Sequence, residues 1–461
     1  MWNPDLSKRR GPRHLALVEA IREAVESGVV APGEKLPPQR KLAFALGLSL
    51  GTVTRAYMDA ERRGLVRGEV GRGTFAHRPE NRTGPLSLWS PERSNDGPID
   101  LVMNLPPPGL GGEALQRTFA ALAIEPGLSG LLDHHPGGWI AGHCRSAAAW
   151  LGRTGLEAES GSVVLTNGAQ HGILSALMAI TRPGDVLLAE RLTYPPMKEI
   201  AHHLGLRLIG LDMDSKGLLP DALEAACRKG KPKALYCMPT LHSPTGITMP
   251  ESRRREIARV AERHELIVIE DDVFGFLPRE RPRPLACWLP DRAIYVTSAS
   301  KCMAPGLRIG MLRAPSSLVE AVRGVVKMSC WMPAPIMAEI VHRWISDGTA
   351  DRLNAGLREE MAARCQAARE ILPGRFSGQG GLRFHLWLKL PEFWQETSFR
   401  EAAARRGVRI ATGDIFSLKP GDAPGSIRLA LGCEARRERL FAGLRTVAGL
   451  IDARPAESFV V

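Results

Sequence analysis

The chain is 461 residues long, which exceeds what one hydrophobic core supports and suggests about three domains. An apolar content of 44%, a charged content of 24% and a net charge of +12 describe a globular protein that could have a polyanionic partner. The eight cysteines form no C-x-x-C pair, no apolar run reaches the roughly 18 residues that a spanning helix needs, and M-W-N-P begins no signal peptide. We therefore expect a cytoplasmic protein with no disulfide framework, no metal site and no membrane span.

The first 77 residues have the pattern of a small separate domain. Apolar residues at helical spacing predict a helix over 14–27, and two prolines lead into a short helix over 39–46. Gly47 then breaks the chain, and Ser49 is a suitable N-cap for a third helix that runs to about residue 63. Two short helices joined by a tight glycine-containing turn, the second opening with hydroxyl residues, are typical of a helix-turn-helix.

A glycine-rich hairpin is predicted after these helices. The runs L-V-R-G at 65–68 and G-T-F-A at 73–76 flank E-V-G-R, so we expect two short strands with an arginine at the tip, the shape of a wing. Three stretches resemble the GntR family of winged helix-turn-helix regulators: G-E-K-L-P-P-Q-R-K-L-A, L-G-L-S-L-G-T-V-T-R-A-Y and G-L-V-R-G-E-V-G-R-G-T-F. The resemblance covers nearly all of residues 13–76 and implies that this domain binds double-stranded operator DNA.

The GntR resemblance implies DNA-facing roles for particular residues. Arg40 should meet a phosphate, the helix that starts at Ser49 should enter the major groove, and the wing should reach phosphate or the minor groove. The expected contact residues are Arg40, Ser49, Thr52, Thr54, Arg55, Arg72 and Gly73. Leu50 stands where the family often has arginine, which removes one expected base or phosphate contact. The alternative is that the three helices form a dimerisation module.

Residues 78–98 are rich in Pro, Gly, Ser, Asn and charged residues, which predicts a linker. From residue 99 onward, predicted strands alternate with helices, the pattern of an α/β fold with a mostly parallel sheet. The expected strands are 162–166, 186–189, 206–211, 234–237, 266–269 and 293–296. We expect this large domain to span 99–335, and a smaller α+β domain with strands at 382–388 and 426–431 to span 336–461.

Lys301 lies in T-S-A-S-K, just after the predicted strand 293–296. Ligands bind at the carboxyl ends of strands in open α/β sheets, and a lysine there is suited to forming an imine with an aldehyde cofactor. Ser298, Ser300 and Arg308 would hold the phosphate of such a cofactor, because hydroxyls and the planar guanidinium donate to oxyanions. The alternative is a solvated loop lysine.

Two further features lie at predicted strand ends. Residues 167–170, N-G-A-Q, turn from a strand into a helix. A glycine turn of this kind presents backbone amides to an anion, although such turns also serve simply to connect elements. Asp271 follows the apolar residues of a buried strand, where a carboxylate is costly unless a cation pairs with it. A protonated pyridine nitrogen would be such a cation.

These pieces occur in the order found in a known family. The ordered set resembles the fold-type I aminotransferases that use pyridoxal phosphate: N-G-A-Q at 167–170, L-T-Y-P-P around Tyr194, H-S-P-T-G at 242–246, Asp271, S-A-S-K with Arg308, and S-I-R-L-A-L-G around Arg428. The resemblance covers about residues 99–450. With the winged helix in front, the whole chain resembles the MocR-type regulators, in which a GntR domain is fused to an aminotransferase-like domain.

The aminotransferase resemblance implies a role for each of these residues. Lys301 would form the internal aldimine, and Asp271 would keep the pyridine nitrogen protonated. Tyr194 would stack on the ring, and Arg428 would pair with an effector carboxylate. The other expected cofactor-binding residues are Ser298, Ser300, Arg308, Gly168, Ala169, Gln170 and Ser243, and His134 is a second candidate for effector binding. Taken singly, Tyr194 could be a core aromatic and Arg428 part of a structural ion pair.

Two departures from the aminotransferase pattern bear on function. Ser243 stands where these enzymes usually have Asn, and Val273 and Phe274 stand where they have Tyr. Both missing groups normally donate to the 3′-oxygen of the cofactor, so cofactor anchoring is retained while catalytic tuning is weakened. Loss of one such donor commonly costs roughly 2.7 to 4 kcal/mol in barrier height, which harms a transaminase more than a sensor.

The sequence thus favours a homodimeric transcription factor that depends on pyridoxal phosphate, binds operator DNA and senses the cofactor or a small amine through Lys301. A working aminotransferase that carries an autoregulatory DNA-binding domain is the alternative. A regulator that has lost the cofactor and keeps the fold as a dimerisation scaffold is a third interpretation.

Overall fold

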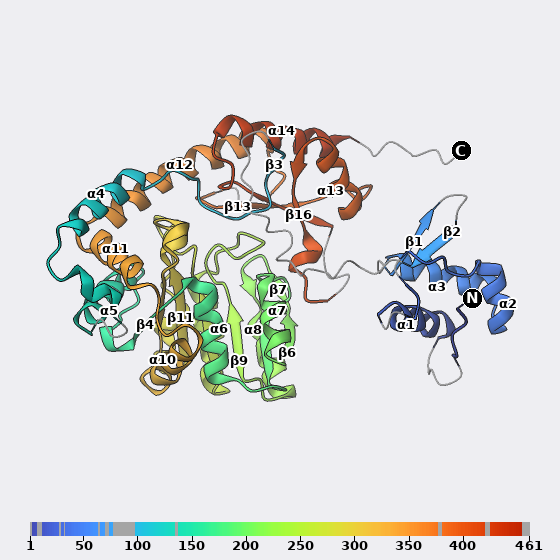
Figure 1. Cartoon of the computed structure of the whole chain (residues 1–461), viewed down its shortest axis with the longest axis horizontal. Coiled ribbons are helices and arrows are strands. Elements are labelled where there is room, and N and C mark those ends of the chain that lie inside the picture. Colours follow the sequence, from blue (N-terminus) through green and yellow to red (C-terminus); the bar gives the residue numbers. More distant parts are fainter. Residues whose placement is uncertain are drawn as a thin grey trace. The chain divides into compact units, whose positions relative to one another are not determined.

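The computed structural model describes residues 2–6, 12–26, 29–31, 33–62, 65–69, 73–76, 97–133, 137–376, 380–419 and 425–453 (Figure 1). The chain divides into two compact units, Met1–Ser90 and Pro91–Val461. None of the helices in the described ranges has the length and apolar character needed to span a bilayer.

The N-terminal unit contains three helices followed by a hairpin. Its elements are α1 (Arg13–Glu26), α2 (Gln39–Leu46), α3 (Leu50–Arg62), β1 (Val66–Glu69) and β2 (Gly73–Ala76). β1 and β2 pair antiparallel. The apolar side chains at helical spacing converge on one core that includes Leu17, Ile21, Leu42, Val53 and Tyr57. The predicted helix-turn-helix and its two following strands are therefore confirmed.

The turn between α2 and α3 has the chemistry that the sequence predicted. Gly47 ends α2 in the left-handed region with φ 63°, a conformation that favours glycine. The Ser49 hydroxyl lies 3.2 Å from the backbone nitrogen of Thr52 and accepts its hydrogen bond, which caps α3. Thr54 Oγ1 donates to Gln39 Oε1 at 2.7 Å and so ties the two helices together.

A seven-stranded sheet forms the centre of the C-terminal unit, in the order β4-β12-β11-β10-β9-β5-β6. Its strands are β4 (Val163–Thr166), β5 (Val186–Glu190), β6 (Arg207–Leu211), β9 (Ala234–Cys237), β10 (Ile267–Asp271), β11 (Ala293–Ser298) and β12 (Gly310–Arg313). Only β12 runs antiparallel to its neighbours. The other six match the strands predicted from sequence, whereas β12 was not predicted.

Helices cover both faces of this sheet. They are α5 (Gly137–Gly152), α6 (Gly168–Ile180), α7 (Pro196–His203), α8 (Pro220–Lys229), α9 (Glu251–Arg263) and α10 (Ser316–Cys330). Alternate residues of each strand enter different apolar clusters: Leu187 and Ile269 join one, Leu188 and Val268 the other. This two-sided burial explains why the strands are continuous apolar runs in the sequence.

The C-terminal part is a smaller α+β layer. It contains α12 (Thr349–Ile371), α13 (Glu396–Arg405) and α14 (Arg437–Asp452), with an antiparallel sheet of β13 (His385–Lys389), β16 (Ser426–Ala430) and β15 (Ala411–Thr412). The preceding helix, α11 (Pro335–Ser346), packs instead against α5 and α4 (Gly112–Ala123), and its buried residues belong to an apolar cluster of the central sheet. Several pairings were not predicted, among them the parallel pairing of β3 (Ile99–Asp100) with β14 (Val408–Arg409). The first described residues of this unit therefore lie with its last ones (Figure 1).

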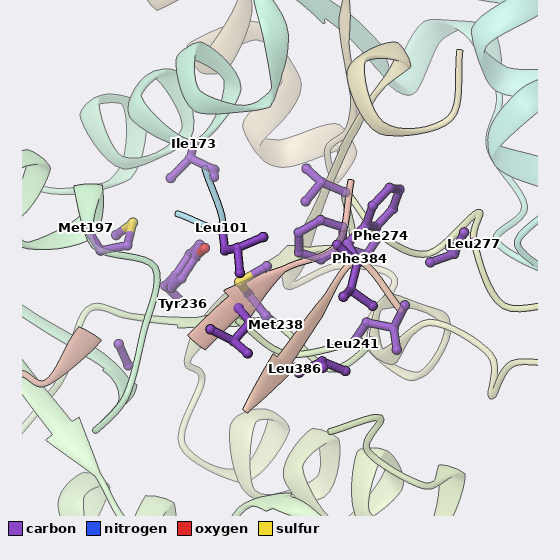
Figure 2. Close-up of a cluster of buried hydrophobic side chains, with 14 of the residues drawn as sticks. Leu101, Ile173, Met197, Tyr236, Met238, Leu241, Phe274, Leu277, Phe384 and Leu386 are labelled. Atoms are coloured by element: carbon purple, nitrogen blue, oxygen red, sulfur yellow. The ribbon is translucent and has the colours of Figure 1, made fainter. Parts of the chain in front are cut away.

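The segment after β3, Leu101–Leu105, continues into the interior. Leu101 is fully buried, and Figure 2 shows it in one apolar cluster with Tyr236 and Met238 from the central sheet side and Leu386 from the smaller sheet. The Leu101 carbonyl accepts from the Ala430 amide of β16 at 2.7 Å. This segment thus runs between the two layers, where the candidate site also lies.

Candidate cofactor and effector site

The predicted site residues gather at one edge of the central sheet. Lys301 ends a short 3₁₀ turn (Ala299–Lys301) directly after β11, and Asp271 is the last residue of β10. Gly168 opens α6 just after β4, and Tyr194 and Ser243 follow β5 and β9. These strands run parallel to one another, so their carboxyl ends meet at the same edge. The structure therefore brings together residues that are far apart in the sequence.

Lys301 has its amine inside the site. Its Nζ donates a hydrogen bond to the main-chain oxygen of Asn104. Burial lowers the pKa of Lys301 to about 7, with the positive charges of Arg428 and Arg308 acting in the same direction. A large fraction of this amine is therefore unprotonated near neutral pH, which is the form that attacks a carbonyl carbon.

Asp271 is a buried carboxylate held by neutral donors. Tyr236 donates its hydroxyl to Asp271 Oδ2 at 2.7 Å, and the Val273 amide donates to Oδ1 at 3.2 Å. Burial raises the pKa of Asp271 to about 6, so the group is still mostly charged at pH 7. No cation in the described ranges forms an ion pair with it. The site thus holds a buried negative charge that a cationic ring nitrogen would complement.

The turn at Gly168 and the Arg308 side chain form a cradle. Gly168 has φ +79°, and a Cβ added there would lie 2.6 Å from Arg308 Nη2. Within the described part of the chain, the hydrogen bonds of the Arg308 guanidinium are long, at 3.5 Å to Ser300 Oγ and 3.5 Å to the Asn167 carbonyl. The first-turn amides of α6, at Gly168, Ala169 and Gln170, have no carbonyl partner within the helix. Loosely held cationic donors at a helix amino end suit a phosphate.

Not every predicted residue contributes visibly to this cradle. Ser298 is buried at the end of β11, where its main chain pairs with Gly310, and Ser300 reaches Arg308. Tyr194 lies close enough to Asp271, Arg308 and Arg428 for their charges to act on its hydroxyl, whose pKa is raised chiefly by burial. His134 falls outside the described residues.

Arg428 is a buried cation on the central strand of the smaller sheet. It donates from Nη1 to Ser243 Oγ at 3.4 Å and from Nη2 to the Val102 carbonyl, and its guanidinium lies 4.7 Å from the centre of the Phe416 ring. Its Nε has no partner, and no carboxylate of the described residues pairs with it. Burial lowers the pKa of Arg428 to about 10, so it stays charged. A buried, unpaired guanidinium fits a ligand carboxylate.

The two departures from the aminotransferase pattern have structural roles. Phe274 is buried and packs against Phe384, with ring centres 5.4 Å apart (Figure 2). It therefore belongs to the apolar core and has no hydroxyl to offer. The Ser243 hydroxyl oxygen accepts a hydrogen bond from Arg428 Nη1.

Sequence reasoning missed Tyr236, Asn104 and His385. Tyr236 lies within an apolar strand, where a buried tyrosine hydroxyl needs a hydrogen-bond partner. That requirement could have indicated a polar neighbour such as Asp271. Asn104 precedes a proline-rich stretch that gave no sign of a role. Among the residues that the structure describes, no group of His, Cys, Asp and Glu is arranged to hold a metal ion.

The predicted DNA-facing residues lie on the surface of the N-terminal unit. Arg40, Ser49 and Arg55 are exposed, and Thr52 and Thr54 are partly so. Gly73 opens β2 with φ +120°, and a Cβ there would lie 2.6 Å from Lys35 Cε. Leu50, at the start of α3, is 42% exposed. Arg72 falls outside the described residues.

Comparison with known proteins matches both units. The model of the class I and II aminotransferases covers residues 143–442, and that of the bacterial regulatory proteins of the gntR family covers residues 14–76. The chain is 27% identical to the uncharacterized HTH-type transcriptional regulator YdeF of Bacillus subtilis, over 98% of this chain and 97% of that protein. It is also 27% identical to the HTH-type transcriptional regulator TauR of Rhodobacter capsulatus, over 87% and 88% of the two chains.

Solved structures show the same fold. An archaeal alanine:glyoxylate aminotransferase superposes with a TM-score of 0.70 at 24% identity, covering 77% of this chain and 90% of that one. Pyrococcus horikoshii kynurenine aminotransferase gives a TM-score of 0.70 at 22% identity, covering 77% and 91%. The C-terminal unit thus has the fold-type I aminotransferase architecture, as predicted.

Proposed function

Because the chain belongs to the class I and II aminotransferase family and carries a gntR-family helix-turn-helix domain in front, we propose that it is a transcriptional regulator that uses pyridoxal phosphate to sense a small amine. The N-terminal unit would bind operator DNA, which implies that the protein acts in the cytoplasm. The C-terminal unit would hold the cofactor and recognise the amine. Full-length relatives that are named transcriptional regulators support this assignment over a metabolic enzyme.

The residues present fit pyridoxal phosphate. When bound, this cofactor supplies an aldehyde that reacts reversibly with amines and a ring that accepts electron density. Lys301 would hold the aldehyde end and Asp271 the ring nitrogen, with Tyr194 against the ring and Ser243 beside it. The phosphate would lie on the Gly168 turn with its neighbours Ala169 and Gln170, and on Arg308, Ser298 and Ser300. The cradle supports this fit, since a side chain at Gly168 would fill it.

One observation carries the sensing function: two cations of the site are engaged by the main chain of a single segment. Lys301 donates to the Asn104 carbonyl, and Arg428 donates to the Val102 carbonyl. Ligand groups that bind these cations would compete with the carbonyls of the Leu101–Leu105 segment. Such a ligand would bind better when the carbonyls of this segment have left the two side chains than when they still contact them. A sensor requires a difference in affinity of this kind between two states of the protein. Only β3 separates this segment from the predicted linker to the DNA-binding unit in the sequence.

A homodimer is the assembly that we propose. Ile140 and Trp331 are each 40% exposed, and both line a mostly apolar cavity of about 190 Å³. An exposed apolar patch of this kind fits a second copy of the chain. Sedimentation of wild type and Ile140→Lys tests the assembly: a dimer that weakens in the variant supports it, and a wild-type monomer contradicts it.

The visible absorbance spectrum of the purified protein tests the cofactor function. Wild type with added pyridoxal phosphate should show a protein-bound band that Lys301→Ala lacks, and one or more amines should shift that band without continued turnover. The absence of a bound band would favour a cofactor-free scaffold. A band that cycles with amine and keto acid would favour an active aminotransferase.

A further inference from the structure

Asn104 is held in the site by a chain of hydrogen bonds that fixes its orientation. His385, at the start of β13, is buried and contacts the His242 carbonyl through Nε2 at 3.1 Å. A carbonyl oxygen can only accept, so the proton of the neutral ring is on Nε2. Burial, reinforced by Arg428, lowers the pKa of His385 well below its ordinary value, which keeps the ring neutral.

The tautomer of His385 decides which end of the Asn104 amide faces it. His385 Nδ1 carries no proton, and Asn104 Nδ2 lies 2.9 Å away and donates to it. The opposite amide orientation would bring two acceptors together. Asn104 Oδ1 is therefore the atom left over, and it is buried without a hydrogen-bond partner. Buried polar atoms are nearly always hydrogen-bonded, so an acceptor that is left open inside a site points to a ligand.

The site thus contains one buried hydrogen-bond acceptor and one buried donor, each without a partner among the described residues. Asn104 is the residue whose main-chain oxygen accepts from Lys301, so its open acceptor lies close to the lysine. Arg428 Nε is a buried donor without a partner, and its Nη2 reaches the carbonyl of Val102, two residues before Asn104. The Asn104 side chain is held by His385, so it keeps one anchor in the site when a ligand displaces the main-chain contact to Lys301.

We propose that Asn104 is a specificity-determining residue whose Oδ1 accepts a hydrogen bond from a donor group on the effector. This rests on the proposed function. The effector would then be an amino acid with three recognised parts: an amine that reacts at the Lys301 end, a carboxylate for Arg428, and a hydroxyl or second amine for Asn104. Analogues without the third group leave Oδ1 unpaired and bind more weakly.

The test uses full-length protein loaded with pyridoxal phosphate and pairs of amino acids that differ by one donor. The probes are alanine with serine, alanine with 2,3-diaminopropionate, and 4-aminobutyrate with 4-amino-3-hydroxybutyrate. Dissociation constants come from the change in visible absorbance. In at least one pair, wild type should bind the donor-bearing member about tenfold more tightly, the effect of one hydrogen bond. Asn104→Leu should remove that preference, and Asn104→Asp should shift it toward the second amine.

Asn354 offers a matched control. Its Oδ1 is also buried without a partner, but its Nδ2 donates to the Phe276 carbonyl at 3.0 Å, and among the described residues no hydrogen bond joins it to Lys301, Arg428 or His385. Asn354→Leu should leave the probe preference unchanged. Thermal unfolding and the bound-cofactor band show that each variant is folded and loaded.

Three outcomes decide the matter. A preference lost in Asn104→Leu and kept in Asn354→Leu supports the role of Asn104. Equal binding within every pair in wild type, or an equal loss for both members in Asn104→Leu, overturns it while leaving the proposed function intact, since the amine itself or water would then satisfy Oδ1. A band that responds to no amine overturns the proposed function and this inference together.

Discussion

The amine of Lys301 has a pKa of about 7 because it is buried and lies near two arginines. Only the unprotonated amine attacks an aldehyde, so incorporation of pyridoxal phosphate should speed up as the pH rises through about 7 and then level off. Arg428→Met removes one positive charge, which should raise the pKa of Lys301 and move the midpoint to higher pH. Stopped-flow absorbance between pH 5.5 and 9 measures the midpoint. An unchanged midpoint in the variant would show that Arg428 does not act on this amine.

Gly168 should be intolerant of any side chain. Gly168→Ala would put a Cβ within 2.6 Å of Arg308 Nη2 at a backbone φ of +79°. Both effects disturb the phosphate cradle, and we expect binding of pyridoxal phosphate to weaken by about tenfold or more. Gly161→Ala is the matched control, because a Cβ there meets open space. Equal affinities in the two variants, measured by absorbance titration, would mean that the phosphate binds elsewhere.

Single residues also show how far sequence reasoning reaches. Lys301, Asp271 and Gly168 could be identified because each follows a short apolar strand, and the carboxyl ends of parallel strands meet at one edge. Asn104 and His385 could not be identified, because their roles depend on a contact between residues 281 positions apart in the chain. No local pattern encodes such a contact.

At the scale of elements, the helix-turn-helix depends on a buried hydrogen bond as well as on its apolar core. The Tyr57 hydroxyl of α3 donates to the Pro37 carbonyl at 2.7 Å and fixes the segment that leads into α2. Tyr57→Phe leaves that carbonyl without its donor, which should lower the free energy of unfolding of the N-terminal unit by about 1 kcal/mol.

Urea unfolding of full-length protein, followed by a probe in the N-terminal unit, measures this change. Met58→Leu is the control, because Met58 is 57% exposed and its side chain contributes little to the hydrophobic core. A stability of Tyr57→Phe equal to that of wild type would show that water replaces the tyrosine hydroxyl.

Most strands that sequence reasoning missed depend on long-range pairing, although the missed hairpin of β7 (Met213–Asp214) and β8 (Gly217–Leu218) is local. β12 has only four residues and directly follows the loop that carries Lys301 and Arg308. Its short apolar run was therefore read as part of that loop. β3 has two residues and is defined by its partner β14, more than 300 residues later. In contrast, the six parallel strands of the central sheet were predicted well, because burial on both faces makes them continuous apolar runs.

In the whole molecule, one compact unit is proposed to bind DNA and the other to bind the cofactor and a small amine. The net charge of +12 suits a protein that binds DNA, and proposed contacts to phosphates predict an affinity that falls steeply with salt. The Leu101–Leu105 segment connects these two proposed functions in sequence, since it touches Lys301 and Arg428 and follows the predicted linker. A ligand that displaces its carbonyls would thus act on the part of the C-terminal unit that comes soon after the predicted linker in the sequence.

The most direct test of this account is the affinity for operator DNA, measured with cofactor-loaded protein before and after addition of an amine that shifts its absorbance band. A DNA fragment selected by the protein itself from genomic fragments serves as the operator, at fixed salt. We expect the affinity to change by about fivefold or more in wild type and not at all in Lys301→Ala. Equal affinity of wild type with and without the amine would contradict the central claim that the site regulates DNA binding.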